Sequence, residues 1–516
     1  MNFNSWALTA VVFLPLVGLG VVLLLPKEEE EAIKRVTLVA TLASLASAIY
    51  VLVHWVTNKY YEADRLATFV DEHGRTPFEV NKTWIDVINS NYHIEVDGLG
   101  LPLMVLSAFI TVLCVVYSWN HFPEPHNPKA FLALVLLLEV GMNGTFVAQD
   151  LILFFIFFEI VLLPMYFMIG VWGGPNREYA SIKFFLFTLF GSAFMLLGFL
   201  ALFFKGGRTF DIQELMNSPE IAGLARSTQL WIFGGLALGF AIKVPMFPFH
   251  TWLPDAHTEA PTVGSVLLAA ILLKLGTYGF VKIALPILPE AAEEFAPWIG
   301  LLAVIGIIYG ALGCLAQTDM KRLIAFSSVA HMGFVMLGIA SGTTFGINAA
   351  IFGMVAHGLI TGMLFFLAGS VQHTFHTREL SRLGGLLTQA PHMGWILGFC
   401  AMASLGLPGL AGFWGEFPAI LSAFNPADGR PVETFRTFMV VAAVGTVFAA
   451  GYLLWMLQKV AFGVPKDEFK DAHIHDVSEA EWIAWAPMLA LIVALGVYPN
   501  LLFKLTDASV TRLFGG

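Results

Sequence analysis

Residues 240–279 read FAIKVPMFPFHTWLPDAHTEAPTVGSVLLAAILLKLGTYG and place two lysines, Lys243 and Lys274, inside apolar stretches. Two prolines closely follow the first lysine, and two glycines that we expect to break the helix follow the second. A lysine at mid-membrane costs roughly 2.5–3.5 kcal/mol on insertion scales. A broken spanning helix is tolerated only where its freed backbone faces protein or a water-filled cavity. A segment that accepts both costs is expected to move ions or protons.

The composition is that of a polytopic membrane protein. Hydrophobic residues make up 57% of the 516 residues, only 12% are charged, and the mean hydropathy is +0.76. Soluble domains carry about 25% charged residues. The net charge of −10 is spread over short loops without a basic patch, which argues against nucleic acid as a partner.

Apolar runs of about twenty residues predict an all-α fold with about fourteen transmembrane helices. Strands of a β-barrel would instead alternate over about ten residues, and these runs do not alternate. The polar segment 57–97 is expected to be the longest loop. The predicted spans are 6–25, 36–56, 98–120, 130–147, 150–171, 179–204, 229–252, 259–285, 297–316, 321–341, 345–372, 391–423, 434–462 and 481–505.

Spans 7 and 12 share a pattern that indicates an internal repeat. In span 7 Lys243 stands beside Pro245, and in span 12 Pro408 precedes Glu416. Paired interrupted helices indicate an inverted repeat with a site at its interface, so we predict that spans 4–8 repeat as spans 9–13, with broken helices at spans 7 and 12. The predicted parts are N-terminal helices 1–3 (1–129), two repeat halves (130–285 and 297–462) and a C-terminal helix (481–516).

Glu159, inside span 5, is the predicted partner of Lys243. A buried amine holds its proton more weakly because burial disfavours charge, and a nearby carboxylate reverses the effect. Moving the carboxylate away would release the proton, so the pair can act as a proton switch. The alternative is a static ion pair that joins two helices.

Four further residues inside the spans predict a proton relay. Lys274 has no acid nearby on its own helix face, and His331 and His357 follow in spans 10 and 11. Glu416 in span 12 is the predicted terminal acceptor, and Glu139 in span 4 is assigned an auxiliary role. The alternative for each histidine is a core residue with satisfied hydrogen bonds.

Four polar residues cluster where span 7 meets span 8: His250, Asp255, His257 and Glu259. They are expected near one membrane face, where they would take up protons or cap helices. For Asp255 and Glu259 we favour capping, because acidic side chains are common at helix ends.

We expect neither a cofactor nor a metal in this chain. It has no GxGxxG fingerprint, no P-loop and no His/Cys cluster with metal-ligand spacing. Its three cysteines, Cys114, Cys314 and Cys400, lie in apolar runs without CxxC spacing, which argues against iron–sulfur ligation.

The distribution of basic residues predicts the orientation. Apart from the long second loop, Lys and Arg are more numerous after odd-numbered spans, which places both termini on the outer face. Only Lys243 and Lys274 are expected at mid-membrane positions. The segment before the first apolar run has no Lys or Arg, so that span is expected to be retained rather than cleaved as a signal.

Four motifs resemble the antiporter-like, proton-translocating subunits of respiratory complex I, the NADH:quinone oxidoreductase. They are IKVPMFPFHTWLPDAHTEAP (242–261), ILLKLGTYG (271–279), QTDMKRLIAFSSVAHMGF (317–334) and GLPGLAGFWGEF (406–417). The resemblance covers nearly the whole chain from span 3 onward. It implies a subunit of a translocase in a bacterial inner membrane, with quinone reduction elsewhere in the complex driving proton transfer along a buried Glu/Lys/His axis. It also implies L- and N-type antiporter-like neighbours, and a peripheral redox arm that holds flavin and iron–sulfur clusters.

The resemblance also assigns positions on that axis. It implies the pair Glu159–Lys243, a central Lys274, and His331 and His357 beyond it. Sister subunits typically have lysine where this chain has Glu416, and one of them bears a long C-terminal lateral helix. This chain ends about eleven residues after its last predicted span.

Three other functions remain as alternatives. The first is a subunit of an Mrp-type cation/proton antiporter or of a membrane-bound hydrogenase, which the neighbouring subunits would decide. The second is a passive spacer, against which the insertion costs of the buried titratable residues argue. The third, a redox catalyst in its own right, has no cofactor-binding motif to support it.

Lys243→Ala and Glu159→Gln should each nearly abolish quinone-coupled proton pumping while NADH oxidation with an artificial acceptor stays intact, because each removes one member of the predicted switch. Proton uptake by the reconstituted complex measures this. Normal pumping by either variant in a fully assembled complex would remove the pair from the mechanism.

Overall fold

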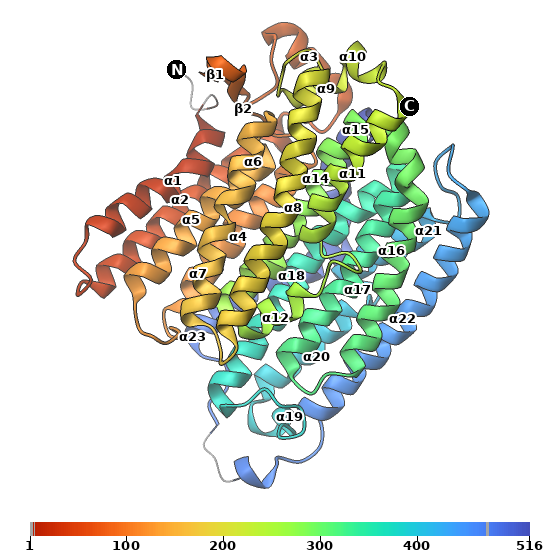
Figure 1. The fold of residues 1–516 in the computed structure, drawn as a ribbon. Helices are drawn as coiled ribbons and strands as arrows, with labels where there is room; N and C mark the ends of the chain where they lie inside the picture. Colours follow the sequence, from red (N-terminus) through yellow and green to blue (C-terminus); the bar gives the residue numbers. More distant parts are fainter. Residues whose placement is uncertain (1–3, 5, 471–473, 516) are drawn as a thin grey trace.

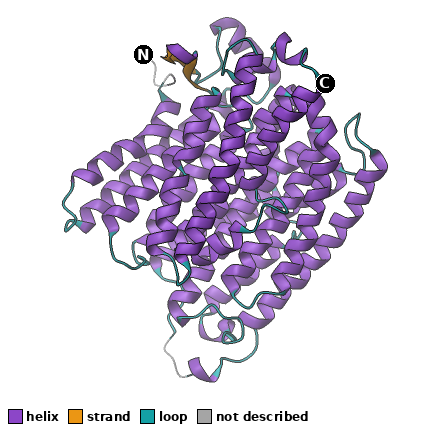
Figure 2. Cartoon of the chain, viewed as in Figure 1, coloured by secondary structure: helices purple, strands orange, loops and turns teal. Residues whose placement is uncertain are grey.

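The computed structural model describes residue 4 and residues 6–470 and 474–515 as a bundle of long helices (Figures 1 and 2). Both chain ends lie at one end of the bundle, called here the terminal end (Figure 1). The prediction of an all-α membrane protein is confirmed, since twelve helices among the described residues are long and apolar enough to span a membrane. They are α1 (Ala7–Leu24), α2 (Glu30–Thr57), α4 (Gly100–Ser118), α5 (Pro128–Val147), the pair α6 (Leu151–Ile160) and α7 (Leu162–Trp172), α8 (Arg177–Lys205), the run from α13 to α15 (Thr262–Ile287), α16 (Pro289–Leu315), α17 (Met320–Ser341), α18 (Thr344–Phe375), α22 (Val432–Val460) and α23 (Glu479–Val497).

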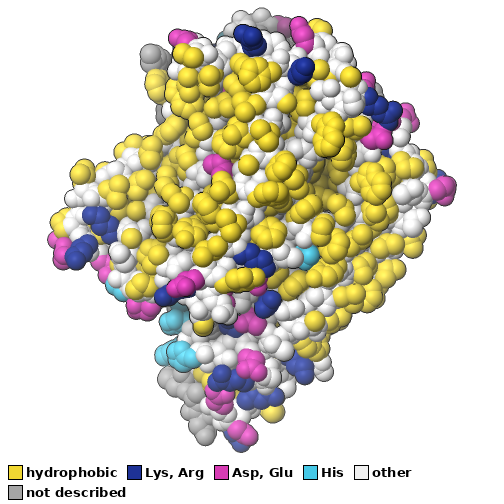
Figure 3. Space-filling model, viewed as in Figure 1, with side chains coloured by type: hydrophobic (Ala, Val, Ile, Leu, Met, Phe, Trp, Pro, Cys, Tyr) yellow, Lys and Arg dark blue, Asp and Glu magenta, His cyan; other side chains and the backbone are white. Residues whose placement is uncertain are grey.

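The outer surface suits a lipid environment. Hydrophobic side chains cover the middle of the visible face, and most charged side chains gather near the helix ends (Figure 3). Large apolar residues such as Leu24, Trp231 and Val447 are exposed. By contrast, an 18-residue apolar stretch of the run Thr262–Ile287, and another of helix α18, are buried throughout. The polar side chains on these two elements are therefore shielded from lipid by the surrounding helices.

The helices of predicted spans 7 and 12 are both interrupted. In span 7 (229–252) α11 (Arg226–Lys243) stops well before the predicted end, and a second helix, α12 (Trp252–Glu259), begins where the span was predicted to end. Span 12 is divided between α20 (Pro391–Ser404) and α21 (Ala411–Ser422). Prolines without a backbone donor interrupt the first. In the second, Gly406 and Gly409 adopt φ of +80° and +93°, which glycine tolerates best.

The glycines after Lys274 have a different role from the one predicted, because the helix continues through them. The run comprises α13 (Thr262–Leu267), the π-helical turn η3 (Leu268–Leu272), α14 (Leu273–Gly279), a second π-helical turn η4 (Phe280–Ala284) and α15 (Leu285–Ile287). A Cβ on Gly276 would lie 2.7 Å from the carbonyl oxygen of Phe240. The glycine therefore permits close packing of α14 on α11.

Short polar residues fix where several helices begin. The Asp150 carboxylate accepts the backbone N–H groups of the first turn of α6, and Asp319 accepts one at the start of α17. Ser478 and Glu481 form a capping box at the start of α23. These contacts satisfy donors that an α-helix leaves free at its first turn.

The segment predicted as a long loop contains regular structure. Helix α3 (Ala63–His73) precedes an antiparallel hairpin of β1 (Val80–Ile85) and β2 (Ser90–Ile94), joined by the 3-10 turn η2 (Asp86–Ile88). The hairpin lies at the terminal end, near α9 (Ile212–Met216) and α10 (Pro219–Ala222) (Figure 1). The opposite end has α19 (Leu386–Gln389) and the 3-10 turn η5 (Asp467–Phe469).

The last predicted span, 481–505, extends beyond the end of the helix in the structure. Helix α23 ends at Val497, and a separate helix, α24 (Asn500–Phe514), begins after Pro499. An apolar run continues across the boundary, so hydropathy alone joins the two. The residues after the last span therefore form a helix rather than a short tail.

One histidine of the hairpin is held by two acids. Nδ1 of His93 lies 2.5 Å from Asp211, and Nε2 lies 3.4 Å from Glu79. Burial disfavours the charged ring, but the two carboxylates outweigh burial and raise the pKa of His93 to about 9. The interaction ties β2 to the loop before α9.

His93→Gln should lower the thermal unfolding temperature most in mildly acidic solution. Because the folded pKa of about 9 exceeds the ordinary 6.5, the charged ring stabilises the fold fully below the unfolded pKa, and this stability is lost as pH rises through the folded pKa. The measurement compares unfolding of the two detergent-solubilised proteins from about pH 6 to about pH 10, a range that spans the titration. A difference that stays constant across this range would show that the charge of His93 contributes nothing.

Candidate functional site

Lys274 lies at the centre of the bundle and is completely buried. Its amine donates a hydrogen bond to the carbonyl of Ala269, in the π-helical turn that precedes it. The same amine lies 2.7 Å from Nδ1 of His357 on α18. A π-helical turn widens the helix and is frequent at functional sites. Here it provides an acceptor for the lysine from the lysine's own helix.

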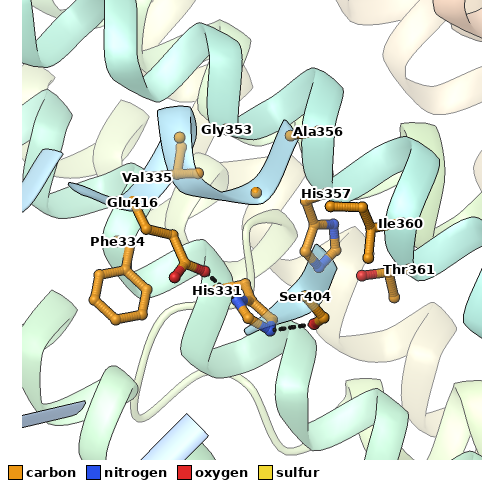
Figure 4. Close-up of a pocket in the computed structure, with 12 residues that line it drawn as sticks. His331, Phe334, Val335, Gly353, Ala356, His357, Ile360, Thr361, Ser404 and Glu416 are labelled. Carbon is orange, nitrogen blue, oxygen red and sulfur yellow. Dashed lines mark hydrogen bonds and ion pairs between the residues drawn. The ribbon is translucent and has the colours of Figure 1, made fainter. Parts of the chain in front are cut away.

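His331 and Glu416 form the other half of the site. Nδ1 of His331 on α17 lies 2.5 Å from Oε1 of Glu416 on α21. The second ring nitrogen, Nε2, lies 3.0 Å from the Ser404 hydroxyl and 3.1 Å from the Tyr452 hydroxyl. The acid and the histidine thus face each other, and Ser404, the last residue of α20, lies on the other side of the ring (Figure 4).

A cavity of about 20 Å³ separates the two halves, with His331, His357, Thr361, Ser404 and Glu416 in its lining (Figure 4). The ring centres of the two histidines are 5.9 Å apart. A cavity needs roughly 10–15 Å³ to hold one water molecule, together with polar partners. Nε2 of His357 and Oε2 of Glu416 make no hydrogen bond within the described part of the chain. The cavity therefore has both the size and the polar groups for a single bridging water.

Glu159 and Lys243 do not form the predicted ion pair in this structure. The buried Lys243 amine lies 4.8 Å from the centre of the Phe158 ring and has no hydrogen-bond partner among the described residues. Glu159, the residue after Phe158, is half-buried beside Ser192 of α8. The two groups interact electrostatically without direct contact. A cation–π contact of this kind holds the amine beside the carboxylate rather than on it.

Glu139 lies apart from the Lys274 site in its contacts. It is completely buried on α5, and its polar neighbours are Ser44 of α2 and Asn143 of α5. None of these residues is a member of the predicted relay. The auxiliary role of Glu139 stays a prediction.

The polar cluster after span 7 has several functions. Asp255 pairs with Lys183 at 2.7 Å, so it joins two helices rather than capping one. Glu259 accepts the N–H of Asn176 just before α8, which matches the predicted capping role. His257 is completely buried against the ring of Phe365.

Sequence reasoning missed two buried lysines. Lys282 and Lys321 are only 1% and 2% exposed, so Lys243 and Lys274 are not the only lysines inside the bundle. Lys282 forms an ion pair with Asp97 at 2.7 Å, and Lys321 donates to the carbonyl of Ala260. Lys282 falls inside predicted span 259–285, and this position could have indicated that it is buried. Ser404 and Tyr452 were also missed, because single hydroxyls in apolar helices are unremarkable in a sequence.

Comparisons with known proteins identify the family. A family model described as "NADH:quinone oxidoreductase/Mrp antiporter, TM" matches residues 148–446, and one described as "NADH-ubiquinone oxidoreductase chain 4, amino terminus" matches residues 78–145. The chain belongs to the family of membrane subunits shared by these oxidoreductases and antiporters.

Within that family the chain belongs with the M subunits, the chain 4 branch. It is 39% identical over 511 residues to NADH-quinone oxidoreductase subunit M of Rickettsia prowazekii, covering 98% of each chain. It is 38% identical to subunit M of Rhodobacter capsulatus, covering 98% of this chain and 96% of the relative.

Solved structures share the fold. A chain of respiratory complex I from Thermus thermophilus matches with a TM-score of 0.82 and 29% identity, covering 99% of this chain and all of that one. A chain of the Mrp complex from Dietzia matches with a TM-score of 0.83, covering 98% of this chain and 52% of that chain. At 21% identity, the Mrp match is evidence for the fold alone.

Glu416→Ala should reduce quinone-coupled proton pumping by roughly 10²-fold or more, in line with the loss of a positioned proton-transfer group. Glu416→Asp should retain substantial pumping, because a carboxylate one methylene shorter can still exchange a proton with His331. Proton uptake at matched electron-transfer rate measures both variants. Equal pumping by the two variants would show that the position is structural.

Proposed function

We propose that this chain is a proton-translocating membrane subunit of an NADH-quinone oxidoreductase, in which quinone reduction elsewhere in the complex drives proton transfer. The observation that carries the proposal is the buried sequence of titratable groups from Lys274 through His357 and His331 to Glu416. Both direct contacts, at 2.7 Å and 2.5 Å, fall within the distance at which protons are exchanged. The relatives named NADH-quinone oxidoreductase subunit M support it.

The contacts suggest a simple relay. Imidazole accepts a proton on one nitrogen and gives one up from the other, so a proton from the Lys274 amine can enter His357 at Nδ1 and leave at Nε2. A water in the cavity would pass it to the His331–Glu416 pair. The Ser404 and Tyr452 hydroxyls hold Nε2 of His331, which orients the ring toward the acid.

Glu159 and Lys243 would act as the switch that loads this relay. Glu159 and Lys243 already interact electrostatically, and rotation of the two long side chains would bring the amine from the ring to the carboxylate. With the amine on the ring, the carboxylate stabilises its charge less than a direct ion pair would. The geometry described above would then be the open position of the switch.

We further propose that the chain has two inverted halves, 130–285 and 297–462, between the N-terminal helices (1–129) and the C-terminal segment (481–516). The two divided spans run in opposite directions. Helix α11 lies nearer the terminal end than α12, whereas α21 lies nearer that end than α20 (Figure 1). This is the relation expected of broken helices in inverted repeats.

Assembly with other subunits follows from the same proposal. L- and N-type antiporter-like subunits would flank this chain, and a peripheral arm would hold the flavin and iron–sulfur clusters. The complex would lie in a bacterial inner membrane, with both termini of this chain on the outer face. Complex I of Thermus thermophilus, one chain of which shares this fold, supports such an assembly.

Isolation of the chain from its native membrane tests this assignment. Co-purification with flavin and iron–sulfur subunits that oxidise NADH is the expected result. Co-purification with antiporter subunits alone, without redox subunits, would instead identify an Mrp-type cation/proton antiporter. Co-purification with hydrogenase subunits would instead identify a membrane-bound hydrogenase.

Lys274→Arg should preserve the charge of the site yet strongly impair pumping. A relay lysine must release its proton, and a guanidinium, with a pKa above about 12, does not. Histidine, which titrates near 6.5, should partly restore transfer. Proton uptake in proteoliposomes that contain the assembled complex, at matched electron-transfer drive, measures all three forms. Wild-type pumping by the arginine variant would reduce Lys274 to a fixed charge.

A further inference from the structure

Three titratable residues alternate from the end of β2 into the segment that follows it. His93, Glu95 and Asp97 are spaced by two residues, and all are buried, with exposed fractions of 5%, 5% and 3%. Ile94 and Val96, which alternate with them, are completely buried. Backbone hydrogen bonds to Gln149 and Val147 extend the pairing of β2 as far as Glu95, so His93 and Glu95 share one face because successive side chains of a strand point to opposite faces. Asp97 is close enough to act on Glu95 electrostatically. We call this segment the polar strand.

The inner end of the polar strand meets the helix that contains Lys274. Asp97 forms its ion pair with Lys282 at 2.7 Å and also accepts the N–H groups of Leu99 and Gly100 at 2.9 and 2.8 Å. Lys282 lies eight residues after Lys274 in the same helical run, which is about 12 Å along a helix. The ion pair therefore connects the polar strand to the helix of the central lysine.

The outer end of the polar strand reaches the surface. His93 lies between Asp211 and Glu79, and the Glu79 side chain is 19% exposed. All these residues lie in the hairpin or in loops at the terminal end. A row of titratable groups thus extends from the buried Lys282 to solvent.

Glu95 in the middle differs from its neighbours. Among the described residues no hydrogen bond or ion pair holds its carboxylate, although Lys282, Asp97, Arg512 and Glu79 all act on it electrostatically. Burial raises the pKa of Glu95 in spite of Lys282. Burial also opposes ionisation of Asp97, but Lys282 outweighs it and lowers the pKa of Asp97. Lys282 thus has two acids nearby whose pKa values are shifted in opposite directions. In such a pair the acid with the raised pKa can carry a proton, and the acid with the lowered pKa stays charged.

We propose that the polar strand is a proton-transfer branch between the Lys274 helix and the surface at the terminal end, with Glu95 as the group that takes up and releases the proton. The inference rests on the proposed function and extends it. In the transfer one N–H bond of the Lys282 ammonium breaks and one O–H bond forms on Glu95. Glu95 then passes its proton outward to the Glu79 carboxylate, and the Lys282 amine regains one from the Lys274 side. Asp97 stays ionised and holds Lys282 in place.

The branch is tested in the assembled complex with Glu95→Gln, Glu95→Asp and the control Asp86→Asn. Asp86 is an exposed acid in the turn of the same hairpin. Two readouts are needed: proton uptake at matched electron-transfer rate, and the carbonyl stretch of protonated carboxylic acids in turnover-induced infrared difference spectra. The second readout reports a proton on Glu95, which a purely structural residue would not give.

We expect the glutamine variant to slow proton transfer through the branch by roughly 10²-fold and to lose one infrared band. The aspartate variant should keep the band at a shifted frequency with partial pumping, and the Asp86 control should match wild type. Unchanged pumping by an assembled Glu95→Gln complex would overturn the branch. If the glutamine variant fails to assemble, the aspartate variant tests the branch. An infrared spectrum of the aspartate variant that is identical to that of wild type would also overturn the branch.

Failure of the branch is distinguishable from failure of the proposed function. If Lys274→Arg impairs pumping while the Glu95 variants do not, the relay stands and the branch is rejected. If neither substitution affects pumping, the proposed function itself is rejected.

Discussion

The contact between the Lys274 amine and the His357 ring is the interaction on which the centre of the structure depends. A lysine buried this deeply needs acceptors, since an uncompensated polar group in an apolar interior is costly. The two acceptors come from the π-helical turn of its own helix and from α18, a helix with an 18-residue apolar stretch that is buried throughout. Their placement requires α17, α18 and the divided helices to surround one line of polar groups.

Hydropathy predicted the helical architecture because the cost of exposing backbone to lipid leaves few alternatives. Most span boundaries lie within a few residues of the helix ends. The hairpin escaped prediction because it lies outside the membrane, where run length carries no signal. Helix α24 escaped because its apolar residues continue those of α23, and only Pro499 marks the boundary.

The sequence marks candidate site residues where a charge interrupts an apolar run, but it does not reveal contacts that depend on geometry. Lys274, His331, His357 and Glu416 stand out in the sequence, and the structure brings them into one row. The π-helical turns have no sequence signature, so the sequence could not predict that the carbonyl of Ala269 accepts a hydrogen bond from Lys274. Glu159 and Lys243 were identified by type, but their separation depends on where Phe158 directs its ring. Lys282 was hidden by its position near a span end, where a lysine ordinarily reaches water.

The close packing of Gly276 against the backbone of Phe240 has a mechanical consequence. With no side chain between them, α14 and α11 approach closely at Gly276, where even a methyl group would collide with the backbone of α11. We therefore expect Lys243 and Lys274 to move as one unit. A movement of this unit would have to be accommodated by backbone changes at its ends, in the proline-interrupted link to α12 and in the two π-helical turns. The flexibility of this link and of these turns, rather than the lysines themselves, would then determine how far a change of charge at Lys243 displaces Lys274.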